Sequence, residues 1–583
     1  MKHAILRLSL LILLTSVAWG WLGKSNSLSA QLLKADLVLL NGRVATMDTA
    51  LPEAQAIAVR GDRILALGTT EQIRSYIDGE TQVIDLQNRF VMPGFIEGHG
   101  HFLGLGQSMM MLRLGNAPTW HAIEQQVAQA AQTAEPGQWI IGRGWHQSKW
   151  KQPPEPNVEG YPTAAELSRL VPDHPVVLTH ASGHMSIANA YAMRLAGVDR
   201  ETKNPPGGEI LRDKAGNPTG VFRETAQGLI AAARARDEAR RSVAERQQQF
   251  RRAIELAAEE CLRKGITSFQ DAGSSFQTID RLREAADRQQ LGVRLWVMIR
   301  DSNSALESNL SRSKLIGYGD NYLTVRAIKR SIDGALGAHG AWLLAPYEDL
   351  PASTGLNTAS IESVQRTADL AVQHGFQLCV HAIGDRANRE VLDIYQSTFE
   401  RNPSAVPRRW RIEHAQHLDP ADIPRFAQLG VIASMQGVHC TSDAVFVPKR
   451  LGMRRSQQGA YVWQSLLKSG AIVTNGTDAP VEDVDPLASF YASVTRRLSD
   501  DVTFFPEQCL TREQALRSYT IDCAYAAFEE SVKGSLVPGK LADLVVLSED
   551  LRTCPQEAIL TTQVLYTIVG GKIRYQSERL VPK

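Results

Sequence analysis

The chain has 583 residues. That is too long for one ordinary hydrophobic core, although an α/β barrel with insertions uses roughly 300 to 400 residues. The 63 Lys and Arg residues against 62 Asp and Glu residues leave a net charge of +1, which argues against a nucleic-acid-binding protein. The six cysteines show neither CxxC nor CxH spacing, so we expect no disulfide framework and no cysteine metal ligand.

The first residues are typical of an export signal. Lys2 and Arg7 flank an apolar run that starts at Leu8 and continues toward Gly20. The run is shorter than the 20 or so apolar residues that a membrane span needs, and small residues at Ala18 and Gly20 permit cleavage. We therefore expect a signal peptide over residues 1–20 and an exported protein, periplasmic or secreted, with no stable membrane partner beyond that signal. An uncleaved anchor is the alternative.

Two β-rich segments lie at opposite ends of the remaining chain. Residues 36–93 contain short apolar runs separated by Asn-Gly and Gly-Asp pairs, which are hairpin signals, and residues 534–575 repeat that style. Neither segment is sufficient alone. We predict that residues 32–93 and 534–583 form one composite β-sandwich; two unrelated appendages are the alternative.

Between these ends, apolar strands alternate with helical stretches such as 242–264 and 362–374, a pattern typical of βα units and a parallel sheet. Eight strands indicate an α/β fold with a TIM-like (β/α)8 barrel over residues 94–533. Residues 104–240 are too long for one crossover and form an insertion after strand one that can cover the barrel mouth. The predicted strands begin at Phe90 and lie at 266–271, 293–299, 323–329, 377–381, 410–414, 431–435 and 471–478.

Residues able to bind a metal fall at the ends of these strands. Strand one ends in His99-Gly-His101, and two residues that are two apart on a strand point the same way. The C-terminal ends of barrel strands meet at one face, where active sites of such barrels lie, and imidazole suits zinc. The later strand ends supply Lys329, His381, His414 and Asp478.

These motifs resemble those of the amidohydrolase superfamily. Pro93-Gly-Phe-Ile-Glu-Gly-His-Gly-His101 is similar to its PGF-(I/V)-x-x-H-x-H motif, and the run from Pro538 to Leu547 to its C-terminal PGK-x-AD signature. The blocks around Lys329, His381, His414 and Asp478 resemble the branch that contains N-substituted formamide deformylase. The resemblance covers residues 36–575 and implies the barrel, the composite sandwich and metal-dependent hydrolysis. Glu97-Gly98 departs from the Asp or Asp-Ser common before His-x-His.

The resemblance also implies a ligand set. His99, His101 and Asp478 would hold one divalent ion, which we expect to be zinc, and His381 and His414 a second. Lys329 would be N-carboxylated and bridge the two ions. Alternatively, Lys329 stays a cation paired with Asp333 and one ion binds. Manganese and iron can share such ligands.

We predict Asp478 to be a general base that assists attack of a metal-bound hydroxide on the carbonyl of a small-molecule amide, N-formyl amide or cyclic amide. Deamination of an amine-bearing ring is the rival reaction. Deaminases of this superfamily use a Glu shortly after the strand-five histidine, whereas Ala-Ile-Gly-Asp follows His381 here. A non-catalytic exported binding protein with the same fold is the third hypothesis.

Several other residues are candidates for supporting roles. His184 and Trp145, both in the insertion, are expected to contact substrate, although a loop histidine and a packed tryptophan are the simpler interpretations. Asp271 and Asp385 are candidate partners of the ligands, whereas His374, His417 and His439 are expected to be structural. A homo-oligomer is left open.

Overall fold

The computed structural model describes residues 33–578 except 148, 149, 151, 181–184, 207, 338, 499 and 500. The expected signal peptide and His184 lie outside the described residues. Among the helices within this part of the chain, none is long and apolar enough to cross a membrane.

The central sheet is a nearly closed parallel barrel of eight strands in a mixed α/β fold. The strands lie in the sheet in the same order as in the sequence, from β8 to β24, and each pairs in parallel with the next. All eight overlap the predicted strands. Their bounds are β8 Phe95–Gly100, β17 Ile266–Ser274, β18 Arg294–Ile299, β20 Leu323–Ser331, β21 Gln377–Ala382, β22 Arg411–His414, β23 Ile432–Gln436 and β24 Val473–Gly476.

Hydrogen bonds between the first and last strands bring the two edges of the barrel sheet together. The Asp478 amide donates to the His99 carbonyl at 2.8 Å, and the His101 amide donates to the Ala479 carbonyl at 2.7 Å. The buried Glu97 carboxylate accepts a 2.6 Å bond from the Thr477 amide. This seam sets the segment after β24 directly against His99 and His101.

The run from Phe90 to His101 is two strands rather than the single strand predicted. Phe90–Pro93 is β7, which belongs to a sheet outside the barrel, and β8 begins at Phe95. A Cβ at Gly94 would lie 2.1 Å from the Thr267 side chain, so only glycine lets the chain pass this close to β17. Because apolar residues continue on both sides of Gly94, the sequence pattern gave no sign that one strand ends and another begins there.

Helices cover the barrel because each has one apolar face. In α12 (Asp385–Arg401), the buried side chains Val391, Tyr395 and Thr398 recur every three or four residues. The predicted helices at 242–264 and 362–374 are confirmed as α7 (Val243–Arg263) and α11 (Ile361–His374). The other helices longer than five residues around the barrel are α2 Phe102–Met109, α8 Phe276–Asp287, α9 Asn303–Ser313, α13 Ile423–Leu429, α14 Gly437–Asp443, α15 Val447–Gly459, α16 Trp463–Lys468, α17 Pro486–Thr495, α18 Arg512–Ser518 and α19 Ile521–Ala526.

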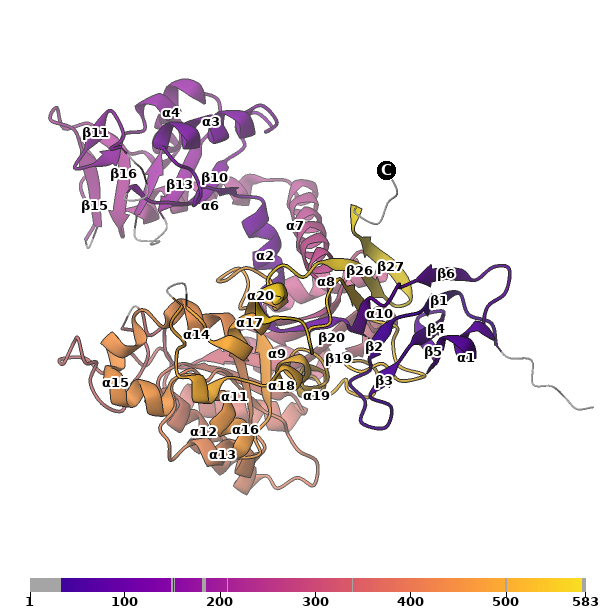
Figure 1. Cartoon of the computed structure of the whole chain (residues 1–583). Helices are drawn as coiled ribbons and strands as arrows, with labels where there is room; N and C mark the ends of the chain where they lie inside the picture. The colour runs from indigo at the N-terminus through magenta and orange to yellow at the C-terminus, as the bar shows by residue number, and fades with distance from the viewer. Residues whose placement is uncertain are drawn as a thin grey trace, which may run out of the picture.

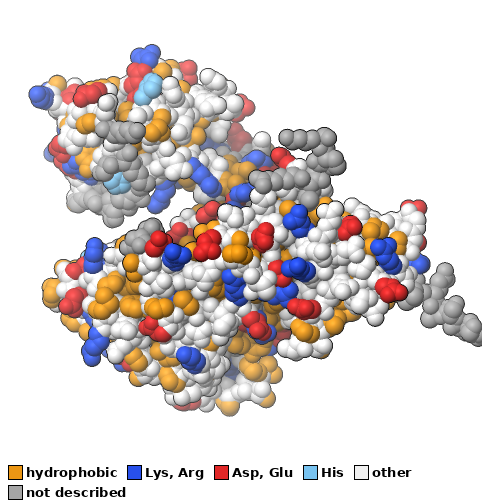
Figure 2. All heavy atoms as spheres, in the orientation of Figure 1, with side chains coloured by type: hydrophobic (Ala, Val, Ile, Leu, Met, Phe, Trp, Pro, Cys, Tyr) orange, Lys and Arg blue, Asp and Glu red, His pale blue; other side chains and the backbone are white. Residues whose placement is uncertain are grey.

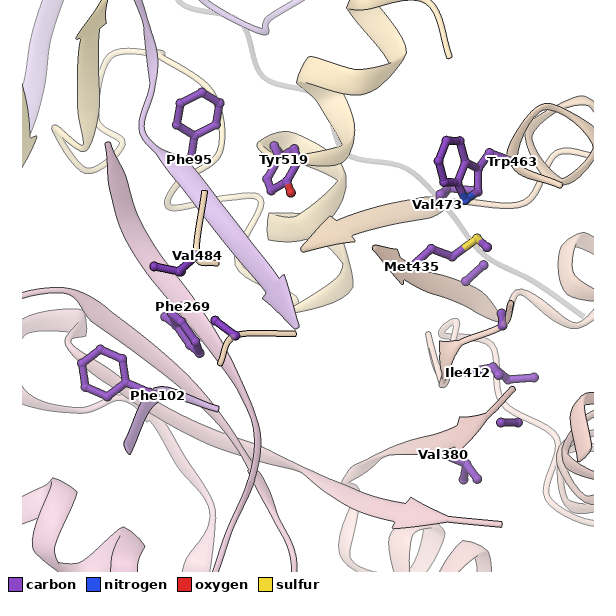
Figure 3. Close-up of a cluster of buried hydrophobic side chains, with 14 of the residues drawn as sticks. Phe95, Phe102, Phe269, Val380, Ile412, Met435, Trp463, Val473, Val484 and Tyr519 are labelled. Carbon is purple, nitrogen blue, oxygen red and sulfur yellow. The ribbon is translucent and has the colours of Figure 1, made fainter. Parts of the chain in front are cut away.

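Aromatic side chains pack between the strands and these helices (Figure 3). The rings of Phe95 and Tyr519 meet edge to face at 5.9 Å, and those of Phe102 and Phe269 at 5.3 Å. Phe95 and Phe102 therefore anchor the segment that carries His99 and His101 at both of its ends.

Strands from both ends of the chain pair in one six-stranded sheet, in the order β27-β26-β25-β7-β2-β3. A four-stranded sheet, β5-β4-β1-β6, shares an apolar cluster with it that includes Leu39, Ile57, Val91, Leu544 and Ile568. Figure 1 shows these first and last segments side by side. The strands are β1 Leu37–Leu40, β2 Arg43–Ala45, β3 Glu53–Ala54, β4 Ala56–Arg60, β5 Arg63–Gly68, β6 Gln82–Asp85, β25 Leu544–Leu547, β26 Val564–Val569 and β27 Lys572–Gln576.

The insertion after β8 has its own sheet and its own apolar clusters. The sheet order is β15-β16-β14-β13-β10-β9, in which β9 is Leu112–Arg113, and separate clusters form around Trp145 and around Phe222. In Figure 1 the insertion stands apart from the barrel and is joined to it through α2 and α7. Its longer elements are α3 Trp120–Ala131, β10 Ile140–Trp145, α4 Ala165–Leu170, β13 Val176–His180, β14 Met185–Ala188, α5 Ala190–Ala196, β15 Gly208–Arg212, β16 Pro218–Glu224 and α6 Gln227–Arg240.

Candidate metal centre

Three predicted ligands converge at the seam of the barrel. The Asp478 Oδ1 atom lies 3.2 Å from His101 Nε2 and 3.5 Å from His99 Nε2. Zinc bonds of about 2.0–2.1 Å at tetrahedral angles set two ligand atoms about 3.4 Å apart. The distance from Asp478 to each of the two histidines therefore fits ligands of one bound ion.

His414 and His381 continue the cluster along β22 and β21. The His414 ring centre lies 4.6 Å from that of His99 and 4.5 Å from that of His381. Ligand atoms of His99, His414 and Asp478 all lie within 4.8 Å of one another. His414 thus stands between the two predicted ion positions and contacts the donors of both.

The buried amine of Lys329 belongs to the same cluster. Its Nζ atom lies 3.4 Å from His99 Nε2. Burial lowers the lysine pKa from its usual value, and this outweighs the opposing influence of Glu413 and Asp478. A lowered pKa favours the neutral amine.

Asp333, the alternative partner of Lys329, is held by other groups. Its two oxygens accept hydrogen bonds from the backbone amides of Ile383, Gly384 and Trp342 at 2.8–3.0 Å. Burial raises its pKa to about 7 despite those bonds. Asp333 also lies 3.5 Å from His381 Nε2, and it supports the segment that follows that histidine at the end of β21.

A buried ion pair behind the cluster orients His99. The Arg411 guanidinium donates to both oxygens of Glu413, at 2.7 and 2.9 Å, and Glu413 also contacts His99 Nδ1. Although burial would raise the Glu413 pKa, Arg411 and His99 hold it well below its usual value. A carboxylate on Nδ1 fixes the imidazole tautomer and leaves Nε2 free to bind a metal. Gln436 Oε1 plays the same part for His414 Nδ1, at 2.9 Å.

The protonation states of the donors suit a cation. Burial lowers the pKa of His99 to about 4 and that of His381 to about 3, and it also lowers the pKa of His414. Burial alone would raise the Asp478 pKa, but the His101 hydrogen bond and the nearby histidines lower it overall. Neutral imidazoles and an ionised carboxylate are the forms that coordinate divalent ions.

The backbone at two donors is strained. His414 has φ of 75° and Asp478 has φ of 57°, in the left-handed region that side-chain-bearing residues rarely adopt. Such strain costs about 1–3 kcal/mol and is concentrated at functional sites. Here the seam hydrogen bond from the Asp478 amide to His99 holds the conformation.

The carboxylates considered as supporting partners contact backbone rather than ligand side chains. Glu97 turns toward the Thr477 amide, and burial raises its pKa to about 8. Asp271 accepts from the Phe102 amide at 2.9 Å, directly after His101, and Asp385 accepts from the Leu344 amide at 2.8 Å. The carboxylate that contacts His99 Nδ1 is Glu413, which sequence reasoning missed.

Trp145 lies away from the donor cluster, contrary to the expected substrate contact. It is fully buried in the insertion, its ring stacks on Trp150 at 6.1 Å, and its indole N–H donates to the Leu178 carbonyl at 2.9 Å. Its apolar ring fills the core of that domain. The packing interpretation of Trp145 is therefore the one that the structure supports.

His439, expected to be structural, lies beside the donors. It is buried on α14, three residues after β23, and its ring lies nearly parallel to that of His414 at 6.2 Å. Gln416 Nε2 contacts its Nδ1 at 3.1 Å, and its Nε2 has no hydrogen-bond partner among the described residues. Its place just after a barrel strand was the signal that could have identified it.

Comparisons with known proteins identify the family. Residues 82–575 match the model of the amidohydrolase family. The chain belongs to the amidohydrolase family. This amidohydrolase is 33% identical to Protein LONG AFTER FAR-RED 3 of Arabidopsis thaliana over 98% of this chain and 96% of that one. It is 28% identical to N-substituted formamide deformylase of Arthrobacter pascens, over 93% and 98%.

A solved structure shares the fold. The crystal structure of an uncharacterized metal-dependent hydrolase from Pyrococcus horikoshii superposes with a TM-score of 0.73 at 25% identity. The match covers 89% of this chain and 99% of that one. The amidohydrolase is thus a hydrolase with the barrel of metal-dependent relatives.

We expect acid to destabilise the amidohydrolase. His417 is buried against Tyr461, and burial lowers its pKa to about 3. Between about pH 3 and 6.5 the unfolded chain binds a proton there that the folded chain does not, so stability falls as pH falls through that window. In denaturant titrations from pH 7 to 5, His417→Gln should reduce the slope of unfolding free energy by up to about 1.4 kcal/mol per pH unit. An unchanged slope would contradict this assignment.

Proposed function

We propose that the protein hydrolyses a non-peptide C–N bond in an amide, an N-formyl amide or a cyclic amide, with a divalent metal. The observation that carries the proposal is the 3.2–3.5 Å spacing of His99, His101 and Asp478 donor atoms at the barrel seam. The relative named N-substituted formamide deformylase supports the amide class.

In this proposal, His99, His101 and Asp478 hold one ion, and His381 and His414 hold a second. Imidazole and carboxylate donors in this number suit zinc. When bound, the metal lowers the pKa of a coordinated water from 15.7 to about 7 and polarises a carbonyl oxygen. The Glu413 side chain contacts His99 Nδ1 and the Gln436 side chain contacts His414 Nδ1, which leaves the Nε2 atom of each imidazole available to a metal.

Asp478 acts as the general base. Its lowered pKa keeps it ionised at neutral pH, so it can accept the proton of the attacking water. It then delivers that proton to the departing nitrogen as the C–N bond breaks. Its strained backbone aims the carboxylate at the space between His99 and His101.

Lys329 is proposed to carry a carbamate. The neutral amine attacks carbon dioxide, an N–C bond forms, the amine proton leaves to water, and the product is an anionic ligand. Burial and the lowered pKa of Lys329 favour the neutral amine, and Asp333 is occupied by three backbone amides. The anion would bridge the ion at His99 and the ion at His381.

A substitution of Lys329 tests whether the site holds two ions bridged by a carbamate or one ion beside an unmodified lysine. We expect Lys329→Met, purified in bicarbonate buffer, to retain one metal per chain where the unmodified protein holds two, as counted by plasma mass spectrometry. Lys314→Met is the control for loss of a lysine, because Lys314 is an exposed lysine whose amine donates to the His374 and Gly375 carbonyls instead. One ion in both the variant and the parent protein would favour the unmodified cation.

His439 offers a free Nε2 to substrate. We expect His439→Gln to lower kcat/KM by about 10- to 100-fold, the cost of one hydrogen bond to a charged group, with metal content unchanged. His417→Gln, assayed at pH 8, is the control for loss of a buried histidine nearby. Equal activity of both variants would show that His439 does not contact substrate.

The test of the proposed function is a substrate panel with the zinc-loaded protein. N-formyl amines, N-acyl amines, cyclic amides and amino-substituted heterocycles are incubated separately, and carboxylate, formate and ammonia release are measured. We expect amide cleavage that a chelator abolishes and zinc restores. Ammonia from heterocycles alone would indicate a deaminase, and a protein that neither holds nor recovers a divalent ion would indicate a binding protein.

We propose that the two end sheets are the layers of one β-sandwich, supported by the apolar cluster that they share.

We also propose that the protein is exported. Secretion of the full chain by a bacterial host, with loss of about the first 20 residues by mass spectrometry, would test the signal.

A further inference from the structure

A cavity separate from the metal donors lies where the insertion meets the barrel. Its volume is about 430 Å³, and its walls come from β10 and α6 of the insertion and from α2, α7 and α8 of the barrel. Cavities of this size accept small molecules. None of the proposed metal ligands lines it.

The charge of the cavity favours an anion. Four half-buried arginines line it, and the single lining carboxylate is Glu238, 3.8 Å from one of them. These arginines are Arg234, Arg241, Arg246 and Arg281. Arg241 and Arg281 form no ion pair with any described residue. Half-buried guanidinium groups bind carboxylates through paired hydrogen bonds, so two of them outside any ion pair favour a bound anion. Figure 2 shows Lys and Arg side chains on the face of the insertion that looks toward the barrel.

The remaining wall is mixed: four glutamines and Thr278 are polar, and the apolar side chains are Leu103, Met110, Met111, Trp139, Ile141 and Phe250. Trp139 is 5% exposed, and its indole N–H is buried with no hydrogen-bond partner among the described residues. Phe250 lies under the Arg281 guanidinium, 5.5 Å from ring centre to Cζ. The Trp139 and Phe250 rings thus give this part of the wall an apolar surface beside Arg281.

We propose that this cavity binds an organic carboxylate with an apolar body. The carboxylate would lie between Arg241 and Arg281, and the apolar body would lie along Phe250 and the Trp139 ring. Arg241 and Trp139 belong to the insertion side and Arg281 to α8 of the barrel. One ligand would therefore contact both parts and hold them together.

Calorimetric titration of octanoate into the full-length, metal-loaded protein tests the proposal. We expect saturable binding that is at least tenfold weaker in Arg241→Gln/Arg281→Gln. Arg283→Gln is the matched control, because Arg283 is on the same helix but lies over the Tyr318 ring, outside the cavity. Retained melting temperature and amide hydrolysis in the double variant would show that the fold persists.

Three results would overturn the assignment. Unchanged octanoate affinity in the double variant would show that the two arginines do not bind the carboxylate. Equal affinity for octanol would show that the site does not require a negative charge. Loss of octanoate binding in Asp478→Asn would place the carboxylate at the metal centre instead. Inorganic phosphate binding as tightly as octanoate would contradict the apolar body.

Discussion

Asp478→Asn is expected to lower turnover by about 10³-fold or more while the fold is retained. General-base catalysis contributes about 10²–10⁴-fold, and this residue is also a proposed ligand. The amide nitrogen of asparagine cannot accept the proton of the attacking water. The measurement is kcat on the best substrate of the panel, together with metal content and melting temperature.

A second carboxylate controls for the loss of charge. Asp522→Asn removes a half-buried carboxylate that pairs with Arg517 at 3.1 Å and is not a proposed ligand, and it should leave kcat within about twofold. Near-normal turnover in Asp478→Asn, with metal still bound, would refute its role as base. Lost turnover in both variants would point to a general effect on folding.

Glu413→Gln should be the most damaging substitution behind the ligands. It leaves the fully buried Arg411 guanidinium without its counter-charge, and removal of one partner from a buried pair costs about 3–5 kcal/mol. It also removes the carboxylate from His99 Nδ1, and loss of such a partner typically costs 10- to 100-fold in metal affinity. Denaturant unfolding and competitive zinc titration measure the two effects separately.

The double variant Arg411→Met/Glu413→Leu distinguishes stability from metal binding. Replacing a whole buried ion pair by apolar side chains is often neutral, so we expect the unfolding free energy to recover. Zinc affinity should stay low, because His99 still lacks its carboxylate. Recovery of both would mean that Glu413 supports the fold alone.

Much of the barrel could be predicted because its strands are apolar runs of a length typical of buried strands, ended by polar donors. His381, His414 and Asp478 follow such runs, and the barrel topology brings strand ends together without any knowledge of side-chain contacts. The break at Gly94 could not be predicted, because it depends on the closeness of Thr267, far along the chain.

The supporting residues were harder to identify for the same reason. The Arg411-Ile-Glu-His414 motif was visible, but the contact of Glu413 with His99 joins strands that are far apart in the sequence. Trp145 in a Gly-rich motif gave no sign of whether its ring faces a pocket or a core. Periodicity reports which side of a strand a residue takes, and it carries no information about its partner across the barrel.

The seam between β24 and β8 has a thermodynamic consequence. Donors from the first and last barrel strands meet only when this edge is shut, so an ion held by His99, His101 and Asp478 would act as a clasp on the ring of strands. Ligands that bind only the native state raise its stability with their concentration. The concentration of the divalent cation would therefore set the thermal stability of the closed barrel, independently of any catalysis.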